Sequence, residues 1–215
     1  MKGLAPHTHK IFEAVSSLEC IKPYILVGGT ALSLQIGTRQ SEDLDFMKWK
    51  TSREDRSEVN WSQIEKELST VGEIQARNLL DIDHVEFILE GVKLSFYSSP
   101  KFTPVKKSIH ILNNLYVADI TSIGAMKMEV LLRCSNFRDY YDIYSILKAD
   151  VSIHDMITLA LEYSGHRLKT KKLLSILTNG KRFERDSNIT NLQPVYHVTP
   201  SEIELYIKNL LGRFS

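Results

Sequence analysis

Two aspartates spaced one residue apart are the part of this sequence best suited to chemistry. Asp43 and Asp45 flank Leu44 and are followed by Phe46, a polar–apolar alternation that is typical of a strand. Side chains two residues apart in a strand point to the same face, so both carboxylates would lie on one side of a sheet. Carboxylate oxygens suit Mg²⁺ or Mn²⁺, and Mg²⁺ completes its shell with substrate phosphates. The pair therefore predicts a divalent metal site that serves a phosphorylated substrate.

A glycine turn precedes the aspartates and would add a seat for phosphate. Gly28 and Gly29 let backbone N–H groups approach a ligand closely, because no Cβ stands in the way. Thr30 is expected to cap the next helix, whose first N–H groups attract anions. A lone Gly-Gly is commonly only a turn, and a lone Asp-x-Asp is commonly a solvated strand edge. Their joint occurrence, with Arg39 and Ser41 between them, favours a site for a metal-bound triphosphate.

Composition excludes several classes of protein. The formal net charge of +1 gives no global field for DNA wrapping or membrane attraction. The two cysteines, Cys20 and Cys134, are too few for a disulfide framework and lack zinc-site spacing, so we expect buried or half-buried free thiols. The N-terminus has no apolar signal core, and no apolar run approaches membrane-spanning length. We therefore expect a cytoplasmic protein without a membrane partner.

The elements that must position these residues are expected to be strands and helices in the N-terminal part of the chain and helices alone in the C-terminal part. Periodicity and turn signals predict strands over 24–27, 44–46, 74–78, 84–90, 92–97, 109–112 and 115–117. Glu90-Gly91 and Asn113-Asn114 read as hairpin turns. The expected helices are one from Thr8 to Pro23, then 31–36, 52–69, 125–132, 139–147, 153–163, 168–177 and one that begins with the capping box Thr199-Pro200-Ser201-Glu202. This order predicts an α+β protein with an α/β-type core over 1–118 and a helical region over 119–215.

Three segments then carry a family resemblance. VGGTAL followed by RxSxDLDF resembles the first motif of the DNA polymerase β-type nucleotidyltransferase superfamily. More narrowly, it is similar to the AbiEii/AbiGii toxin-like nucleotidyltransferases of bacterial toxin–antitoxin and phage-defence systems. VKLSFY, residues 92–97, looks like the family's strand that runs up to the active site, and 119–147 looks like its A-M-K helix followed by an Arg/Asp-rich helix. The resemblance covers residues 24 to 148 in order.

The resemblance implies a fold and a set of roles. The fold would be a polymerase β-like mixed sheet with flanking helices, and the helical C-terminal region would complete the active-site cleft. Asp43 and Asp45 would bind the metal, and Lys127 would reach the nucleotide phosphates. The other residues implied to bind the nucleotide or line its cleft are Gly28, Gly29, Thr30, Arg39, Ser41, Lys93, Asp139 and Asp142.

Lys127 also has a physical argument of its own. It lies in an otherwise apolar helical stretch, where a cation needs an anionic partner or a path to water. The functional interpretation is a phosphate ligand. The alternative is a salt bridge to Asp139 or Asp142, because Arg/Asp-rich helices are often simply ion-paired.

One position departs from the superfamily pattern. Polymerase β-like enzymes place a third carboxylate on a neighbouring strand, where it helps to hold a second metal and to activate the attacking hydroxyl. The equivalent strand here carries Ser95. The acids that could substitute, and among which the sequence does not choose, are Glu86, Glu90, Asp139 and Asp142. The general base, the number of metals and turnover itself therefore stay open.

The expected function is metal-dependent transfer of a nucleotidyl group from an NTP to a hydroxyl acceptor. The family points to a toxin with an RNA acceptor such as tRNA and a separately encoded antitoxin. A small hydroxylated acceptor, as in antibiotic-modifying enzymes, and a non-catalytic nucleotide- or protein-binding module are the alternatives. Basic runs at 106–107, 167–172 and 181–185 could bind RNA phosphates, although such runs are more often solvated helix faces.

Overall fold

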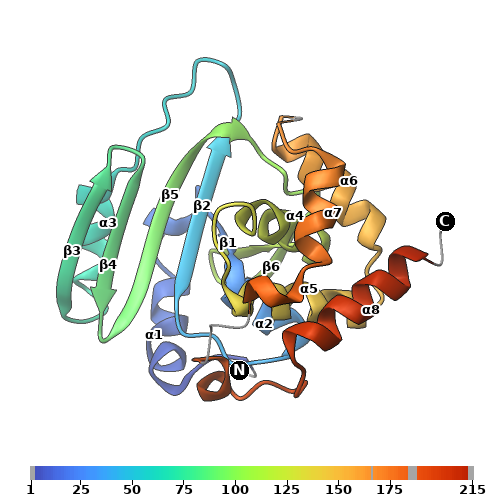
Figure 1. Ribbon diagram of the computed structural model, residues 1–215. Coiled ribbons are helices and arrows are strands. Elements are labelled where there is room, and N and C mark those ends of the chain that lie inside the picture. Colours follow the sequence, from blue (N-terminus) through green and yellow to red (C-terminus); the bar gives the residue numbers. More distant parts are fainter. Residues whose placement is uncertain (1–2, 166, 184–187, 213–215) are drawn as a thin grey trace. The chain divides into compact units, whose positions relative to one another are not determined.

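The computed structural model describes residues 3–165, 167–183 and 188–212 (Figure 1). The contacts of the chain divide it into two compact units, Met1–Asp119 and Ile120–Ser215. The first unit is mixed α and β, and the second is helical. The predicted boundary fell after residue 118.

The first unit is built on one sheet of seven strands within the part of the chain that the structure describes. The strand order is β3-β4-β5-β2-β1-β7-β6, and the first four of these lie side by side in Figure 1. Strand β2 runs antiparallel to β1 and parallel to β5, and β1 runs parallel to β7, so the sheet is mixed. The strands are β1 (Ile25–Val27), β2 (Leu44–Lys50), β3 (Ile74–Asp81), β4 (His84–Leu89), β5 (Val92–Phe102), β6 (Ser108–Leu112) and β7 (Leu115–Ala118).

The central strands bury one face and leave the other half-exposed. Alternate residues at the start of β2 (Leu44 and Phe46), along β4 and along the first half of β5 are buried, and three of them, Phe46, Phe87 and Phe96, meet as an aromatic cluster. Phe46 and Phe96 stack with ring centroids 4.9 Å apart. Because successive side chains of a strand alternate between faces, the intervening residues form the opposite, half-exposed face. That second face carries the polar residues of the candidate site.

Two threonines that the sequence marks as helix caps have a different role. Helix α1 (Pro6–Ser16) begins two residues before Thr8, and α2 (Gly28–Ile36) begins two residues before Thr30. Proline at the first position starts α1, and the glycine turn is itself the start of α2. Gly37 ends α2 in the left-handed conformation, as its position predicted.

The predicted helix over 52–69 is shorter in the structure. Helix α3 spans Trp61–Leu68, and the Asn60 side chain caps it by accepting from the Gln63 N–H. The preceding residues form a loop in which the Asp55 carboxylate accepts hydrogen bonds from Thr51 and Ser52. Short polar side chains of this kind compete with helical backbone bonds, which is why the helical period did not produce a helix there.

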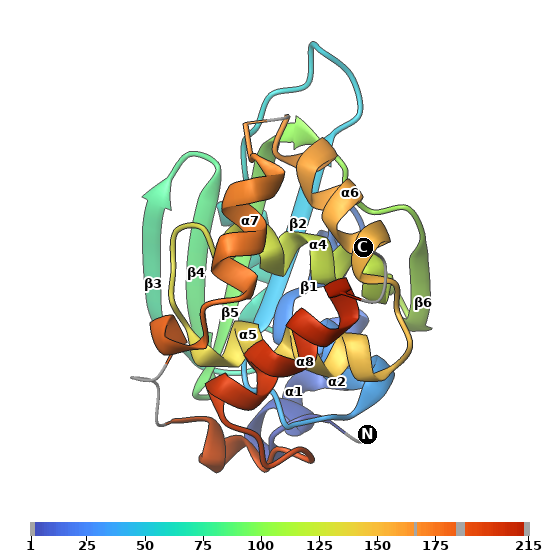
Figure 2. The ribbon, with the colours of Figure 1, turned by 45° about the vertical axis from the view of Figure 1, so that its right-hand side comes forward.

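The second unit consists of packed helices, seen together in Figure 2. They are α4 (Ile120–Val130), α5 (Phe137–Lys148), α6 (Ile153–Tyr163), α7 (Thr170–Leu177) and α8 (Pro200–Gly212). Tyr140 stacks on Phe183 at 4.2 Å and donates its hydroxyl to the Leu177 carbonyl, which anchors α5 in this core. The predicted capping box of α8 is confirmed, since Thr199 and Glu202 exchange hydrogen bonds.

The cysteines differ from each other in exposure. Cys20 is buried, in agreement with the prediction, but Cys134 is exposed. The expectation for Cys134 was wrong because α4 ends at Val130, so Cys134 lies in the irregular segment before α5 and not on a helix face.

Candidate active site

Gly28 lies directly against one of the two aspartates. Its φ is +71°, a left-handed conformation that favours glycine. A Cβ added to Gly28 would lie 2.8 Å from Asp45 Oδ2, and the preceding residue, Val27, is the register partner of Asp45 across β1 and β2. The glycine turn and the carboxylate therefore share one small volume. Binding of a metal-bound phosphate at this place stays a prediction.

Gly29 is required by a buried arginine. A Cβ at Gly29 would lie 2.4 Å from Arg39 Nη2 and 3.0 Å from Ser41 Oγ. Arg39 is only 6% exposed, and its Nη1 donates to the Gln40 carbonyl. The Arg39 guanidinium therefore packs directly against the glycine turn. A direct role of Arg39 or Ser41 in nucleotide binding stays a prediction.

Thr30 ties the glycine turn to the aspartate strand. Its side chain is 1% exposed, and its hydroxyl donates to the Asp43 carbonyl and lies 2.9 Å from Ser41 Oγ. In this arrangement the hydroxyl contacts the chain itself, so the structure makes Thr30 a support of the aspartate segment. Nucleotide binding by Thr30 stays a prediction.

The segment that leads into β2 is held at three successive carbonyls. The Ser41 carbonyl accepts from the Ala5 N–H at 3.0 Å, and the Glu42 carbonyl accepts from the Thr8 hydroxyl at 2.6 Å. The Thr30 hydroxyl holds the third, that of Asp43. The main chain is thus fixed immediately before the two carboxylates.

A polar row crosses the half-exposed face of the sheet beside the aspartates. Asp45 pairs with Ser95 across β2 and β5, and Ser95 pairs with Glu86 across β5 and β4. Register partners on adjacent strands point to the same face, so these three side chains lie in one line. Ser95, at the position where the superfamily pattern has an acid, is therefore the direct neighbour of Asp45.

Lys93 places a positive charge between Asp43 and Glu86. Its Nζ lies 3.7 Å from Asp43 Oδ2 and 3.9 Å from Glu86 Oε1. Of the substitute acids in the first unit, Glu86 shares this face, whereas Glu90 lies in the hairpin turn with φ +50° and accepts from the Glu73 N–H. Of these two acids, Glu86 is therefore the one on the same face as Asp45, and a role for it as a substitute acid stays a prediction.

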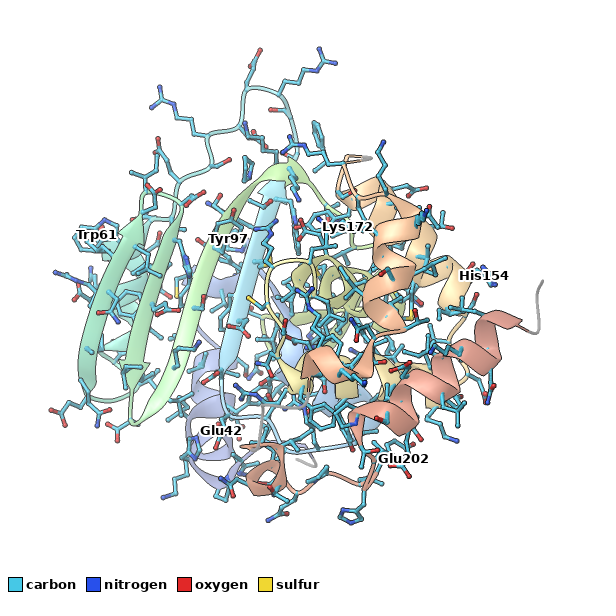
Figure 3. All side chains as sticks on the ribbon, in the orientation of Figure 1. Glu42, Trp61, Tyr97, His154, Lys172 and Glu202 are labelled. Carbon is cyan, nitrogen blue, oxygen red and sulfur yellow. The ribbon has the colours of Figure 1, made fainter. Side chains whose placement is uncertain are left out.

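His84 was assigned no role in the sequence, yet it contacts this row. His84 Nε2 lies 3.1 Å from Ser95 Oγ and 3.9 Å from Glu86 Oε1, and its ring meets Tyr97 edge to face (Figure 3 labels Tyr97). A signal for this contact was present in the sequence. The predicted two-residue turn at Glu90-Gly91 fixes the hairpin register, which places residues 84 and 86 beside residues 97 and 95.

The second unit contains the predicted lysine and its two acids in contact. Lys127 Nζ lies 2.7 Å from Asp139 Oδ1 and 2.7 Å from Asp142 Oδ2. Lys127 is 6% exposed and Asp142 is fully buried. The salt-bridge alternative is thus realised with both aspartates at once. The catalytic and nucleotide-binding roles of these three residues stay predictions.

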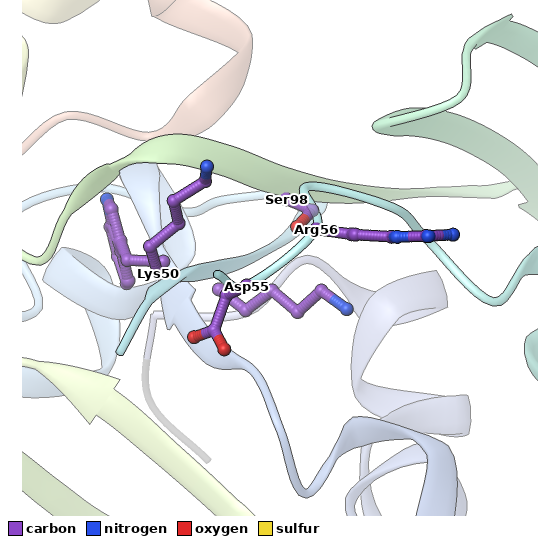
Figure 4. A pocket seen from close by; sticks show the side chains of 6 residues that line it. Lys50, Asp55, Arg56 and Ser98 are labelled. Atoms are coloured by element: carbon purple, nitrogen blue, oxygen red, sulfur yellow. The ribbon is translucent and has the colours of Figure 1, made fainter. Parts of the chain in front are cut away.

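A small pocket lies at the far end of β2 in the first unit. It has a volume of about 170 Å³ and is shown in Figure 4. Hydrogen bonds from the Thr51 and Ser52 side chains and N–H groups lower the pKa of Asp55, so this acid stays ionised in the pocket. The lining residues are Lys48, Trp49, Lys50, Asp55, Arg56 and Ser98.

The two aspartates fit a metal that is completed by its substrate. Among the residues that the structure describes, no group of three or more histidine, cysteine, aspartate or glutamate side chains is arranged to hold a metal ion. Asp43 and Asp45 alone would supply two oxygen ligands, which suits Mg²⁺ bound through one or two carboxylates plus phosphates.

The structure also bears on the expectations about membrane-spanning segments and basic runs. Within the described residues, no helix is both long enough and apolar enough to cross a bilayer. Lys106, Lys107, Lys171 and Lys172 are exposed, as solvated basic runs would be, and Arg185 lies outside the described residues.

Comparisons with known proteins identify a family. The family model described as "Nucleotidyl transferase AbiEii toxin, Type IV TA system" matches residues 18–194. An uncharacterized protein of Aquifex aeolicus (strain VF5), aq_aa25, is 28% identical over 150 residues, which are 69% of each chain.

Two solved structures from Helicobacter pylori share the fold. One, provisionally named a nucleotidyltransferase, has a TM-score of 0.57 at 18% identity and covers 96% of this chain and 92% of its own. The other, JHP933, has a TM-score of 0.53 at 19% identity, with 96% and 89% covered. Identities this low support the α+β fold alone, whereas the family match spans most of the sequence. This chain belongs to the AbiEii nucleotidyl transferase toxin family.

Proposed function

We propose that the protein transfers a nucleotidyl group from an NTP to a hydroxyl acceptor in a metal-dependent reaction. The observation that carries this proposal is the contact between the glycine turn and Asp45, where a Cβ at Gly28 would lie 2.8 Å from the carboxylate. A backbone that approaches a carboxylate so closely brings N–H donors and metal ligands to the same phosphates.

Each part of the first unit has a task in this reaction. Asp43 and Asp45 would hold Mg²⁺ or Mn²⁺, which when bound neutralises charge on the phosphates. The first N–H groups of α2, at Gly28 and Gly29, bind the phosphates at the positive end of the helix. Lys93 adds a cation beside Asp43. Transfer then depends on holding the phosphate and the acceptor hydroxyl in line.

The acceptor that we propose is RNA such as tRNA, for a cytoplasmic toxin with an antitoxin partner. The type IV toxin–antitoxin family supports the antitoxin. Lys48, Lys50 and Arg56 around the pocket at the end of β2 offer cations for a phosphate backbone. Lys127, Asp139 and Asp142 remain candidates for nucleotide binding by the second unit.

The first test is isothermal titration of the four NTPs in Mg²⁺ into wild type and into Asp43→Ala/Asp45→Ala. We expect binding that needs both the metal and the two aspartates. Glu13→Ala is the matched control, because Glu13 is an exposed acid on α1 in the same unit. Labelled NTP is then incubated with total tRNA.

The outcomes separate the alternatives. Transfer to tRNA supports the RNA acceptor, and transfer only to small hydroxylated molecules would move the protein to the antibiotic-modifying type. Binding without any transfer would mark a non-catalytic module. If no NTP binds wild type in Mg²⁺, or in Mn²⁺ when the titration is repeated with that metal, the proposal fails.

A further inference from the structure

We propose that His84, acting through the Ser95 hydroxyl, accepts the proton of the attacking acceptor hydroxyl. The inference rests on the proposed nucleotidyl transfer and names the proton acceptor for it. It answers the question left by Ser95, which stands where a third carboxylate is expected.

The first observation is the position of Ser95. It is the register partner of Asp45 on the adjacent strand, and both side chains point to the half-exposed face. An acceptor hydroxyl that approaches a phosphate held at Asp45 therefore meets the Ser95 hydroxyl beside it. A serine is too weakly basic to keep that proton, so it needs a second group.

The second observation supplies that group. His84 Nε2 lies 3.1 Å from Ser95 Oγ, within hydrogen-bonding distance. With its own proton on Nδ1, the imidazole accepts from Ser95. A side chain held at hydrogen-bonding distance from the proton it takes meets the geometric requirement for a general base.

The charged and titratable groups around His84 suit this role. On its own strand, Glu86 lies 3.9 Å from Nε2, and its negative charge stabilises the imidazolium that forms. On β5, Tyr97 packs edge to face on the ring, and Lys93 lies beside Glu86. On β3, Asp81 is the register partner of His84.

Glu86 is the competing base, and the geometry argues against it. Its Oε1 lies 3.9 Å from Lys93 Nζ, so the carboxylate faces that cation, whereas His84 Nε2 is the group at hydrogen-bonding distance from Ser95 Oγ. Glu86 is thus a positioning residue that orients and balances His84.

The step balances without any further reagent. The acceptor oxygen forms a bond to the α-phosphorus while the bond from that phosphorus to the pyrophosphate oxygen breaks, and pyrophosphate leaves with the electron pair. The acceptor proton moves to Ser95 Oγ, and the Ser95 proton moves to His84 Nε2.

The test uses the full chain with labelled NTP and total tRNA. We expect His84→Gln to lower kcat about 10²- to 10⁴-fold, the usual contribution of a general base, while KM and titrated NTP affinity change little. Ser95→Ala should also lower kcat. His110→Gln is the matched control, since His110 lies on β6 at the opposite edge of the same sheet.

A rescue separates a proton role from a structural one. Ser95→Asp places a carboxylate at the register position next to Asp45, so the double variant His84→Gln/Ser95→Asp should regain activity. A carboxylic acid is a stronger acid than an imidazolium, so replacing the imidazole by a carboxylate as proton acceptor should move the acidic limb of the pH–rate profile to lower pH.

Failure of the inference differs from failure of the proposed function. Wild-type transfer that His84→Gln leaves unchanged would overturn the proton role alone. Parallel loss of transfer and NTP binding in His84→Gln would also overturn it, because His84 would then be a structural support. A wild type that binds NTP and transfers nothing would overturn the transferase and the proton role together.

Discussion

At the scale of single residues, two glycines with the same backbone conformation differ in whether they lie against the candidate site. Gly28 and Gly91 both have positive φ, +71° and +77°. A Cβ at Gly28 would meet Asp45, whereas a Cβ at Gly91 would meet nothing within 4 Å. The pair therefore distinguishes the cost of the left-handed conformation from the cost of crowding the carboxylate.

We expect Gly28→Ala and Gly91→Ala each to lower the free energy of unfolding by about 1 to 2 kcal/mol, the cost of a left-handed alanine. Only Gly28→Ala should also weaken NTP binding, because its methyl group displaces Asp45. Chemical denaturation and titration of each variant measure the two effects. Equal NTP affinities would show that the turn does not act through Asp45.

Lys127 balances the buried Asp142 and the partly buried Asp139, so its removal should be costly. We expect Lys127→Met to destabilise the fold by about 3 to 5 kcal/mol, since it leaves Asp139 and Asp142 facing each other without this cation. Lys127→Met/Asp142→Asn should regain part of that loss, and Lys172→Met, at an exposed position of α7, should change little. Urea denaturation measures all three, and no recovery in the double variant would contradict the charge argument.

The two cysteines should react at very different rates. Burial, reinforced by Glu67, raises the pKa of the Cys20 thiol to about 12, so at pH 8 it stays protonated and unreactive. In the unfolded chain the thiol regains a pKa of about 8.5, so its contribution to stability is present below that pH and is lost as the pH rises above it. Alkylation followed by mass spectrometry should modify the exposed Cys134 first and Cys20 only after unfolding.

At the scale of elements, the hairpin of β4 and β5 gives the site its order. Its turn was predicted from Glu90-Gly91, and a two-residue turn already implies that Glu86 opposes Ser95. The pairing of Asp45 with Ser95 could not be predicted in the same way. Strands β2 and β5 are parallel and far apart in sequence, so no local turn sets their register.

The helix starts show what a local pattern misses. Thr8 and Thr30 have the residue type of caps, but each hydroxyl serves a carbonyl in another part of the chain, Glu42 or Asp43. Lys127 shows the same limit, because the sequence offered Asp139 or Asp142 as a partner and the fold supplies both. Local chemistry identified the residues, and tertiary contacts decided their partners.

We expect Thr8→Val and Thr30→Val each to lower the free energy of unfolding by about 1 to 3 kcal/mol, because each leaves a carbonyl without its donor. Thr30→Val should also weaken NTP binding, since the carbonyl that Thr30 holds is that of Asp43, which we propose as a metal ligand. Thr70→Val, at an exposed hydroxyl that bonds the Glu67 carbonyl, is the control and should change little. Thermal denaturation and titration test this, and an unaltered Thr30→Val would contradict the support role.

At the scale of the whole molecule, the chain is two units, and the residues that we assign to the metal and the glycine turn lie in the first. The change from mixed to helical structure was predictable because the hydrophobic period changes from two residues to about 3.6 near residue 119. The α+β class follows from that change.

A ligand that binds the native first unit should stabilise it by mass action. At about 100 times its Kd, Mg²⁺–NTP should add about 2.7 kcal/mol to the free energy of unfolding. We expect this gain in wild type and its absence in Asp43→Ala/Asp45→Ala, as measured by calorimetry. If the units unfold in separate transitions, the one that contains the first unit should shift, and a shift confined to the other would contradict our placement of the site.

The three anchored carbonyls before β2 have a practical consequence at Glu42. Its carbonyl is fixed by Thr8, while its side chain is exposed and sits one residue from Asp43 (Figure 3 labels it). Position 42 therefore combines a rigid backbone with a side chain that is not needed for packing. A fluorophore or spin label could be attached through Glu42→Cys in a Cys134→Ser background. It would report the binding of a ligand at Asp43 and Asp45 from a fixed backbone position, and neither aspartate would be changed.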